Sequence, residues 1–430
     1  MRILILGSGA REHAIAAKLG KEIGKENVFT APGNAGTALC GTNLDVSYTD
    51  FEGLKTFSLA NNIDTILPGS EDSIAGGVRD FFEGSKDTSH IYVFSPDKHA
   101  GQLESSKSFA KEFMAKQNVP TAAYQSFTED TVEQGYAFLE SLTAPYVLKA
   151  DGLAAGKGVL ILEDLAQAKA ALKKMLVDQQ FGAASATVVI EEFLDGIEFS
   201  VFALTDGENY VLLPEAKDYK RIGEGDTGLN TGGMGAVSPV PFYTEALKKK
   251  TIEQVVEPTI KGLKTQNLNF RGFVFFGLIV VNDNPYVIEY NVRMGDPETE
   301  VVIPRLEESL SQLIISAQHG TLTNRSAKTN KKYATTVFAV SGGYPESYVK
   351  GKQITLNSTS ETLFHAGTKN EDGTLFTNGG RVLAATCLGT SISEALSASY
   401  EQVKGISFEG KYFRTDIGKD LLKFIENGSN

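Results

Sequence analysis

The sequence has little of what marks secreted, membrane-spanning or nucleic-acid-binding proteins. Its two cysteines, Cys40 and Cys387, stand far apart, which excludes a disulfide framework and a cysteine metal site. The longest apolar run, 272–281, is roughly half as long as a bilayer-spanning helix. The N-terminus meets charge too early for a signal peptide. A net charge of −12 argues against a broad nucleic-acid-binding surface. Together these absences predict a cytoplasmic protein.

The sequence also has no pattern that indicates catalysis by histidine or serine. The five histidines are scattered and form neither a metal-ligand pair nor a catalytic triad. The G-x-S-x-G pattern of serine hydrolases is missing, and so are internal repeats. Glycine, in contrast, is abundant, with 43 of 430 residues gathered mainly in a few short segments. Those segments are the candidate functional regions.

The length and the pattern of predicted elements indicate about three domains. Apolar strands alternate with helices over 1–103, which predicts an open parallel α/β sheet. A larger domain is expected at 104–325, with a compact small subdomain at about 120–192 inside it. The polar segment 321–332 is typical of a linker, and a small α+β domain is expected at 326–430. The predicted class is α/β, or α+β for the chain as a whole.

The first glycine-rich segment follows the N-terminal strand. Gly7 and Gly9 begin a dinucleotide-binding pattern, but Glu12 stands where the third glycine belongs. A tight strand–helix turn without any ligand would need these glycines anyway. The alternative is a phosphate held by free N–H groups of the helix start, with help from Arg11. Gly20 is the expected C-cap of the helix.

The segment KADGLAAGKGV (149–159) is more specific. It places two lysines around three glycines: Lys149, Gly152, Gly156, Lys157 and Gly158. Such a loop can fold over a triphosphate and donate backbone N–H groups and ammonium groups to it. It is not a Walker loop, because G-x-x-x-x-G-K-[ST] is absent. A hairpin turn with a solvated lysine is the alternative interpretation.

The acidic segment 188–200 joins two predicted strands. Backbone groups near 191–194 could hold a nucleoside base, and Glu198 could accept hydrogen bonds from ribose hydroxyls. An ordinary solvated acidic turn would have the same composition.

The segment 216–239 contains too much glycine for a helix or a strand. Consecutive N–H donors at 230–235 lie near the cations Lys217, Lys220 and Arg221, which suits an anionic carboxylate or an acyl phosphate. A disordered loop is the alternative.

The segment VIEYNVRMGDPETE (287–300) places Glu289, Asn291 and Arg293 on the same side of a strand. A carboxylate and an amide oxygen suit Mg²⁺, which takes its other ligands from water and phosphates. Arg293 could stabilise a phosphoryl group in transfer. A surface strand with paired charges is the alternative.

Taken together, these segments resemble the phosphoribosylamine–glycine ligase family of the ATP-grasp superfamily. The resemblance runs from Met1 to about Gly418, and it rests on the motifs GSGAREHA, ESSKSFAKEFM, VLKADGLAAGKGV, EEFLDGIEFS, NTGGMGAVSP, EYNVRMGDPE, FHAGT and NGGRVL. It implies a doubly wound N-terminal domain, an ATP-grasp domain with a lid subdomain, and a small C-terminal domain. The implied reaction, in de novo purine biosynthesis, joins glycine to 5-phosphoribosylamine through glycyl phosphate, and ATP becomes ADP and phosphate.

The resemblance also implies roles for individual residues. Those expected to bind ATP are Lys107, Lys149, Gly156, Lys157, Gly158, Glu191, Glu192, Leu194 and Glu198. Those expected to bind the other substrates are Gly9, Arg11, Glu71, Asp218, Lys220, Thr231, Gly232, Gly233, Met234 and Arg293. Lys149 and Arg293 are the expected catalytic residues, and Glu289 and Asn291 the expected ligands of Mg²⁺ or Mn²⁺. The expected partners are small molecules, without nucleic acid or membrane, and the chain is expected to be a monomer.

Six positions depart from the family pattern: Ala10, Ser70, Lys217, Tyr219, Leu229 and Glu300. The strand before the metal pair also lacks the carboxylate that many ATP-grasp enzymes have there. None of the six changes removes a cation or a metal ligand, so an active enzyme is expected. Three other functions stay open on the residues alone: a dinucleotide-dependent oxidoreductase, an ATP-grasp ligase for another carboxylate or amine, and a non-catalytic nucleotide-binding regulator.

Overall fold

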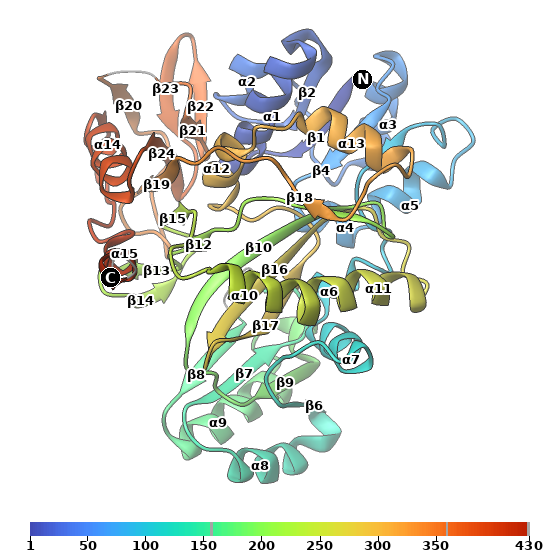
Figure 1. The fold of residues 1–430 in the computed structure, drawn as a ribbon, viewed down its shortest axis with the longest axis vertical. Helices are drawn as coiled ribbons and strands as arrows, with labels where there is room; N and C mark the ends of the chain where they lie inside the picture. Colours follow the sequence, from blue (N-terminus) through green and yellow to red (C-terminus); the bar gives the residue numbers. More distant parts are fainter. Residues whose placement is uncertain (155–157, 358–359, 428–430) are drawn as a thin grey trace.

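The computed structural model describes residues 1–154, 158–357 and 360–427. A central sheet lies in the middle of the molecule, with the N-terminal and C-terminal lobes on one side of it and a smaller lobe at the opposite end (Figure 1). No helix in the described ranges is long and apolar enough to cross a membrane.

The N-terminal lobe is a parallel five-stranded sheet in the order β3-β2-β1-β4-β5. Its strands are β1 (Ile3–Gly7), β2 (Val28–Pro32), β3 (Thr42–Asn43), β4 (Thr65–Pro68) and β5 (Tyr92–Val93). Its helices are α1 (Ala10–Ile23), α2 (Thr37–Cys40), α3 (Phe51–Ala60), α4 (Glu71–Ala75) and α5 (Val78–Glu83). All strands are parallel, but successive strands are added on one side of β1 as far as β3 and on its other side from β4 onward. The carboxyl ends of β1 and β4 therefore form the switch point where such sheets bind ligands. The predicted doubly wound domain is confirmed.

The C-cap predicted at Gly20 is wrong. Helix α1 continues past Gly20 and ends at Gly24, whose φ of 87° lies in the region that favours glycine. Gly20 instead allows a close approach, because a Cβ there would lie 2.8 Å from the carbonyl oxygen of Cys40.

The smaller lobe is the predicted lid subdomain, an antiparallel sheet in the order β6-β9-β7-β8. Its elements are β6 (Tyr124–Thr128), α8 (Val132–Ser141), β7 (Tyr146–Ala150), β8 (Val159–Leu162), α9 (Leu165–Leu176) and β9 (Thr187–Glu191). Phe127, Leu148 and Leu172 belong to a hydrophobic core that this subdomain has to itself.

The central sheet has the order β17-β16-β10-β11-β18. Its strands are β10 (Ile197–Thr205), β11 (Tyr210–Leu212), β16 (Gly272–Val281), β17 (Asn284–Asn291) and β18 (Arg325–Ser326). The helices around it are α6 (Gln102–Ser105), α7 (Lys107–Gln117), α10 (Glu245–Thr251), α11 (Glu257–Thr265), α12 (Thr299–Val302) and α13 (Leu310–Gln318). β18 lies within the segment predicted as a linker, pairs with β11 and forms one edge of the sheet.

The continuous apolar run of β16 follows from burial of both its faces. Successive strand residues point to opposite faces. Phe275 belongs to the core shared with β1 and α13, whereas Phe276 belongs to the core shared with α7 and α11. A strand covered on both sides has no polar face, which explains why 272–281 does not alternate.

The C-terminal lobe consists of two sheets, in the orders β12-β15-β19-β24-β21 and β22-β23-β20-β25. The first contains β12 (Lys217–Asp218), β15 (Gly235–Ser238), β19 (Tyr333–Val340), β21 (Leu363–His365) and β24 (Arg381–Gly389). The second contains β20 (Gln353–Leu356), β22 (Thr368–Glu371), β23 (Thr374–Thr377) and β25 (Ile406–Ser407). The lobe also includes the helices α14 (Ile392–Lys404) and α15 (Leu422–Asn427).

The prediction that 216–239 forms neither helix nor strand is wrong. β12 and β15 come from this segment and join the C-terminal sheet, where β15 pairs with β19. Between them lies a hairpin of β13 (Arg221–Gly223) and β14 (Thr227–Asn230). Glycine lowers the strand propensity of an isolated segment, but pairing with an apolar strand from elsewhere in the chain outweighs it.

Two buried histidines join the N-terminal and C-terminal lobes. His13 on α1 accepts a hydrogen bond at Nδ1 from the backbone N–H of His365 on β21, at 2.8 Å. The rings are 5.5 Å apart, edge to face. Burial lowers the pKa of His13 to about 3, with a further contribution from His365, and burial lowers the pKa of His365 to about 4. The folded protein therefore holds both rings neutral.

We expect this interface to weaken in acid. The unfolded chain takes up protons near pH 6.5, whereas the folded rings resist until pH 4 to 3, so stability present above pH 6.5 is lost as the pH falls. The loss should be on the order of a few kcal/mol by pH 4. Thermal unfolding from pH 7.5 to 4 should show a shallower decline for His13→Gln than for the unmodified chain. His90→Gln, at an exposed position, is the control; an equal decline in all three proteins would contradict the assignment.

Candidate active site

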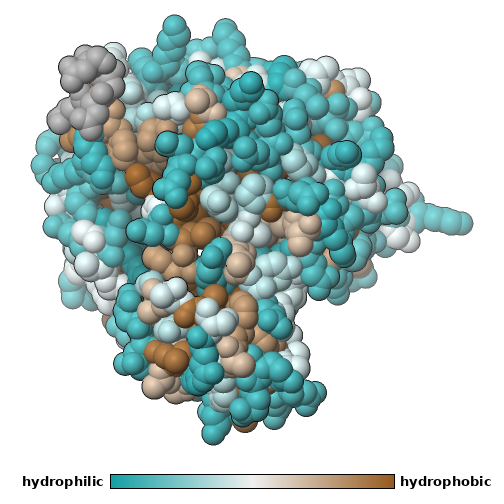
Figure 2. Space-filling model, turned by 60° about the horizontal axis from the view of Figure 1, so that its bottom comes forward, coloured by the Kyte–Doolittle hydropathy of each residue, from teal (hydrophilic) through white to brown (hydrophobic). Residues whose placement is uncertain are grey.

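The lid subdomain faces the central sheet across a cleft. Figure 2 brings the lid forward and shows hydrophobic surface gathered in a hollow where the lower lobe meets the body. Strands β7 and β9 approach this cleft from the lid, and β10 and β17 from the body. An apolar hollow with a few charged groups is the usual surrounding of a small-molecule site.

Glu289 is the negatively charged centre of a basic cluster in the cleft. Burial opposes its ionisation, but the charges of Lys220, Lys107 and Lys149 hold its pKa below the usual value. These side chains come from four different elements, namely β17, the segment after β12, the start of α7, and β7. Three lysines around one ionised carboxylate form a site for a polyanion.

Glu191 lies at the back of this cluster between two lysines. Its carboxylate is 2.9 Å from the ammonium group of Lys149 and 3.3 Å from that of Lys111. Lys111 is 1% exposed and donates to Thr121, which in turn donates to the carbonyl of Val287 on β17. Burial lowers the pKa of Lys111 to about 8, against the charge of Glu191. The Glu191 carboxylate is thus already paired with two lysines, and the predicted contact with a base concerns backbone groups near 191–194 instead.

Glu198 and Lys220 form an ion pair at 2.9 Å at the edge of the cleft. Lys220 lowers the pKa of Glu198, and the pKa of Lys220 is held well above its usual value by Glu198 and Asp218, although burial opposes this. Burial raises the pKa of Asp218. The structure therefore brings the predicted ribose acceptor next to two residues predicted to bind another substrate.

The remaining residues predicted to bind ATP differ in their exposure and hydrogen bonds. Glu192 accepts a hydrogen bond from the backbone of Ala123, and Leu194 is half-buried. Gly158 accepts a hydrogen bond from Ala150 across the turn between β7 and β8. Gly156 and Lys157 lie outside the described residues.

The donors predicted for a metal fit a hard cation. Glu289 and Asn291 are two residues apart on β17, so their side chains project from the same face. They supply a carboxylate and an amide oxygen, the ligand types that Mg²⁺ prefers. No group of three or more histidine, cysteine or acidic side chains in the described ranges forms a cage of its own. A cation held here would complete its shell from water and phosphate oxygens.

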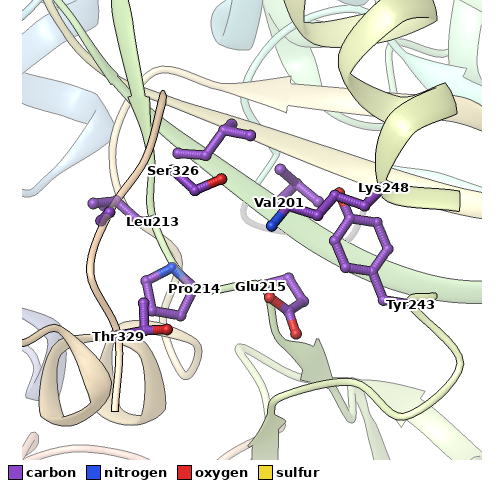
Figure 3. Close-up of a pocket in the computed structure, with 10 residues that line it drawn as sticks. Val201, Leu213, Pro214, Glu215, Tyr243, Lys248, Ser326 and Thr329 are labelled. Carbon is purple, nitrogen blue, oxygen red and sulfur yellow. The ribbon is translucent and has the colours of Figure 1, made fainter. Parts of the chain in front are cut away.

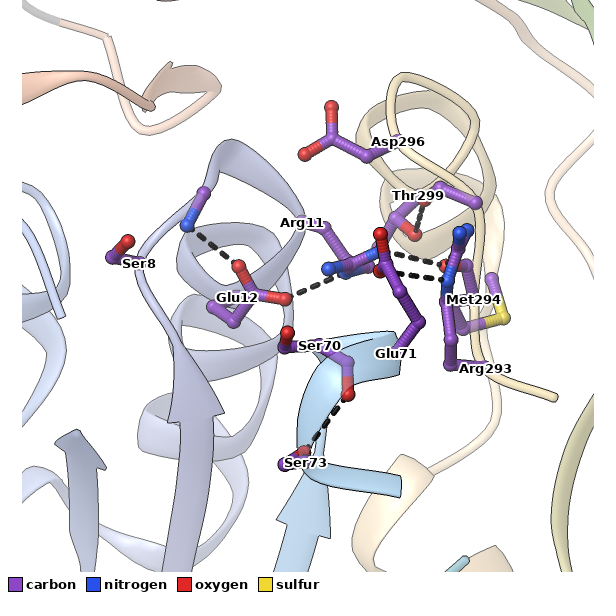
Figure 4. A network of polar contacts seen from close by, with 12 residues as sticks. Ser8, Arg11, Glu12, Ser70, Glu71, Ser73, Arg293, Met294, Asp296 and Thr299 are labelled. Carbon is purple, nitrogen blue, oxygen red and sulfur yellow. Dashed lines mark hydrogen bonds and ion pairs between the residues drawn. The ribbon is translucent and has the colours of Figure 1, made fainter. Parts of the chain in front are cut away.

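A second charged cluster lies where the N-terminal lobe meets the turn after β17 (Figure 4). Arg293 is 2.7 Å from Glu104 and 3.5 Å from Glu71. Arg11 donates to Glu12 and to the carbonyl of Met294. Arg293 and Arg11 lower the pKa of Glu71 although burial opposes this, so the two lobes meet through ionised groups.

Arg293 lies beyond the end of β17, so the prediction that it shares a strand with Glu289 and Asn291 is wrong. Among the described residues, no hydrogen bond or ion pair links Arg293 to either of them. Its carboxylate partners, Glu71 and Glu104, instead place it at the junction with the N-terminal lobe.

The N–H groups at the start of α1 are not all free. Glu12 curls back and accepts a hydrogen bond from the N–H of Gly9 at 2.6 Å. Glu12, which stands where the dinucleotide pattern needs its third glycine, thus takes the N–H of Gly9 that a phosphate was expected to use. The prediction that this N–H is free is wrong.

The row of free N–H donors predicted at 230–235 is also not present. The N–H groups of Thr231 and Met234 donate to backbone carbonyls, that of Gly232 to the hydroxyl of Tyr344, and that of Gly233 to the side chain of Thr231. Met234 is buried in the core of the C-terminal lobe. Gly233 has a φ of 115°, and a Cβ there would lie 2.3 Å from Pro297. The loop is thus a fixed wall that docks on the turn after β17.

Asp296 and Arg381 connect this wall to the rest of the site. Asp296 is 2.8 Å from Arg381, which also donates to the carbonyl of Gly232. On the N-terminal side, Gly9 lies so close that a Cβ on it would be 2.9 Å from a carboxylate oxygen of Asp296. The turn after β17 is therefore the point where the N-terminal and C-terminal lobes meet the end of the central sheet.

The departures from the family pattern are accommodated in different ways. Lys217 lies over the ring of Tyr219, 3.8 Å from its centre, and pairs with Asp420. Leu229 is exposed, whereas Ala10 is fully buried. The backbone carbonyl of Ser70 accepts a hydrogen bond from Ser73 (Figure 4).

A small pocket elsewhere is not the site. It has a volume of about 70 Å³, and Tyr243 and Lys248 line it opposite Leu213 and Ser326 (Figure 3). It contains none of the predicted site residues and has room for a few waters only, since ligand sites typically measure roughly 300–1,000 Å³.

Comparison with known proteins identifies the family. Three family models cover most of the chain: the phosphoribosylglycinamide synthetase N domain at 1–104, its ATP-grasp (A) domain at 105–299 and its C domain at 334–420. The chain belongs to the phosphoribosylglycinamide synthetase family. The predicted resemblance and fold class are confirmed.

Relatives that match this chain over nearly its whole length agree with the assignment to the phosphoribosylglycinamide synthetase family. Phosphoribosylamine–glycine ligases of Vibrio parahaemolyticus and Fusobacterium nucleatum are 43% and 41% identical, each over 97% of this chain and 98% of the relative. The crystal structure of the ligase from Thermotoga maritima has a TM-score of 0.85 at 37% identity and covers 97% of this chain and 100% of its own. The ATP-grasp domain indicates an enzyme that uses ATP and a divalent metal.

Four residues contribute to the two charged clusters or to the turn after β17, although the sequence predicted no role for them: Lys111, Glu104, Asp296 and Arg381. Lys111 follows Lys107 by four residues, so both lie on the same face of α7. Asp296 and Arg381 belong to the motifs GDPE and NGGR, which carry the family resemblance but predicted no contact for these two side chains. Glu104 is the first residue of the motif ESSKSFAKEFM, but its pairing with Arg293 could not be predicted because the two residues are far apart in the sequence.

Proposed function

We propose that the protein joins glycine to 5-phosphoribosylamine at the expense of ATP, and forms glycinamide ribonucleotide, ADP and phosphate. The observation that carries this proposal is the presence of two charged clusters, one around Glu289 and one where the N-terminal lobe meets the turn after β17. Lys107, Lys149 and Lys220 surround Glu289 in the first cluster, which suits a triphosphate. Arg11, Glu71 and Arg293 belong to the second cluster, which suits a substrate that has both phosphate and hydroxyl groups.

The reaction needs no protein nucleophile. The glycine carboxylate attacks the γ-phosphate and forms glycyl phosphate, and the amine of phosphoribosylamine then displaces phosphate. Lys149 and Lys107 would hold the phosphates in line, and Arg293 would stabilise the negative charge of the transferring group. Closure of the lid would exclude water, which would otherwise hydrolyse the acyl phosphate.

Glu289 and Asn291 would hold Mg²⁺ or Mn²⁺. When bound there, the ion neutralises phosphate charge and favours attack at phosphorus. We assign Lys107, Lys149, Gly156–Gly158, Glu191, Glu192, Leu194 and Glu198 to ATP, and Gly9, Arg11, Glu71, Asp218, Lys220, Thr231–Met234 and Arg293 to the other substrates. For Gly9 and for Thr231–Met234 the contacts would involve atoms other than the occupied N–H groups.

We further propose domains at 1–103, 104–325 and 326–430, with the lid at about 120–192. Strand β18 spans the second of these boundaries and ties the segment after it to the central sheet. We also propose that the chain works as a monomer in the cytoplasm, without nucleic acid or membrane.

The decisive experiment measures ADP release with ATP, Mg²⁺ and glycine, with and without phosphoribosylamine generated in situ. We expect sustained turnover only when both acceptor substrates are present. ADP release that depends on neither, or turnover with a different carboxylate or amine, would refute the proposed reaction. Binding of NAD with no ADP release would favour an oxidoreductase.

A further inference from the structure

Glu300 is a buried acid without an evident partner. It lies in the short helix α12 and is 0% exposed. Neither of its carboxyl oxygens accepts a hydrogen bond from a donor in the described residues. An ionised carboxylate in such a place would lose its hydration without replacement, which is strongly unfavourable. The side chain therefore needs another way to satisfy its oxygens.

A second carboxyl group, that of Asp296, lies four residues earlier in the helical turn that Thr299 closes on Gly295, and it is the side-chain hydrogen-bond partner of Glu300. Two carboxyl groups can form such a bond only when one of them is protonated. Asp296 has the better claim to the negative charge, because its carboxylate lies 2.8 Å from the guanidinium group of Arg381. The proton accordingly belongs on Glu300.

The other elements packed on α12 bring no cation to Glu300 that would change this assignment. From α1, Arg11 and Glu12 pair with each other, and the charge of Arg11 faces Asp296. From the turn after α12, Arg305 donates to Ser238 and to the backbone. From β24, Arg381 faces both acids, and β19 contributes the titratable hydroxyl of Tyr333. Burial and then Asp296 hold the pKa of Glu300 well above its usual range.

We infer that Glu300 is a neutral carboxylic acid that donates its proton to Asp296 and is thereby a positioning residue for the turn after β17. Asp296 in turn faces Gly9 of the N-terminal lobe and holds Arg381, which donates to the wall at Gly232. Through Asp296, the proton on Glu300 holds the N-terminal and C-terminal lobes and the turn after β17 in position around the proposed phosphoribosylamine site. This role in catalysis rests on the proposed function, whereas the protonation itself does not.

A first experiment tests the protonation without any substrate. Glutamine in place of Glu300 has nearly the same shape and donates an N–H to Asp296 at every pH. The acid is harder to ionise in the folded than in the unfolded chain, so its contribution to stability is present below about pH 4.5 and falls as the pH rises. The melting temperature of Glu300→Gln, relative to the unmodified chain, should therefore increase steadily from pH 4 to pH 8.

The control for this experiment is Glu307→Gln, a nearby exposed acid that pairs with Lys328. Its melting temperature should stay close to that of the unmodified chain throughout, because an exposed ion pair contributes little to stability. A Glu300→Gln difference that stays constant, or shrinks as the pH rises, would overturn the inference, because it would mean that Glu300 is ionised in the folded protein.

A second experiment tests the positioning role. Glu300→Ala removes the donor, and we expect kcat/KM for phosphoribosylamine to fall at least tenfold while the KM for ATP changes less than twofold. Glu300→Gln should restore most of the lost kcat/KM. Equal impairment of the alanine and glutamine variants would overturn the positioning role. Absence of turnover in the unmodified chain would refute the proposed function and leave the melting experiment valid.

Discussion

Replacement of Glu289 by glutamine is expected to reduce kcat by roughly a hundredfold or more, because the proposed metal site loses the charged member of its pair, Glu289 and Asn291, while a neutral side chain of the same shape remains. A metal ion contributes several kcal/mol to the stabilisation of a phosphoryl-transfer transition state, and about 1.4 kcal/mol corresponds to a factor of ten. Turnover should be measured over a Mg²⁺ titration. Asn291→Ala should shift the same titration to higher Mg²⁺ concentrations, since one neutral oxygen ligand is lost.

Binding of ATP without metal separates this result from misfolding. Lys107, Lys149 and Lys220 are attracted to Glu289, so the glutamine variant leaves the cleft more positive. Metal-free ATP should therefore bind to Glu289→Gln at least as tightly as to the unmodified chain. Glu253→Gln, at an exposed position paired with Lys249, should change neither quantity. A Mg²⁺ titration of Asn291→Ala that superimposes on that of the unmodified chain would refute the metal assignment.

The sequence allowed the fold to be predicted where local pattern and tertiary structure agree. Alternating strands and helices predicted the N-terminal lobe, and the glycine-rich turn between two strands predicted the lid. The predictions failed where distant partners decide. The glycine-rich segment at 217–238 forms strands because β19 offers it a partner about 100 residues further along. No local property of that segment contains the information.

The same distinction applies to the site. Strand periodicity alone was enough to place Glu289 and Asn291 on one face. It could not show that Arg293 is already held by Glu71 and Glu104, or that the N–H groups of the 230–235 loop are already occupied. A side chain or an N–H group looks free in a sequence, because only the folded chain brings its partner to it.

Replacement of Lys149 by alanine is expected to weaken ATP binding roughly ten- to a hundredfold. The ammonium group lies 2.9 Å from Glu191 and its charge acts on Glu289, and a hydrogen bond to a charged group contributes about 1.5–3 kcal/mol. Glu191 would keep Lys111 as its partner, so the buried carboxylate would not be left without a cation. The fold should therefore survive, and the melting temperature of the nucleotide-free protein should change little.

Isothermal titration calorimetry with ATP would measure this effect directly. Lys116→Ala is the matched control, because this lysine lies on α7 with Lys107 and Lys111 but is exposed and has only a weak pair with Glu112. The double variant Lys149→Ala with Lys111→Met should lose far more stability than either single variant, since it leaves Glu191 buried with no counter-charge. Unchanged ATP affinity in Lys149→Ala would show that Lys149 serves only as a partner for Glu191. The phosphate-binding role would then pass to Lys107.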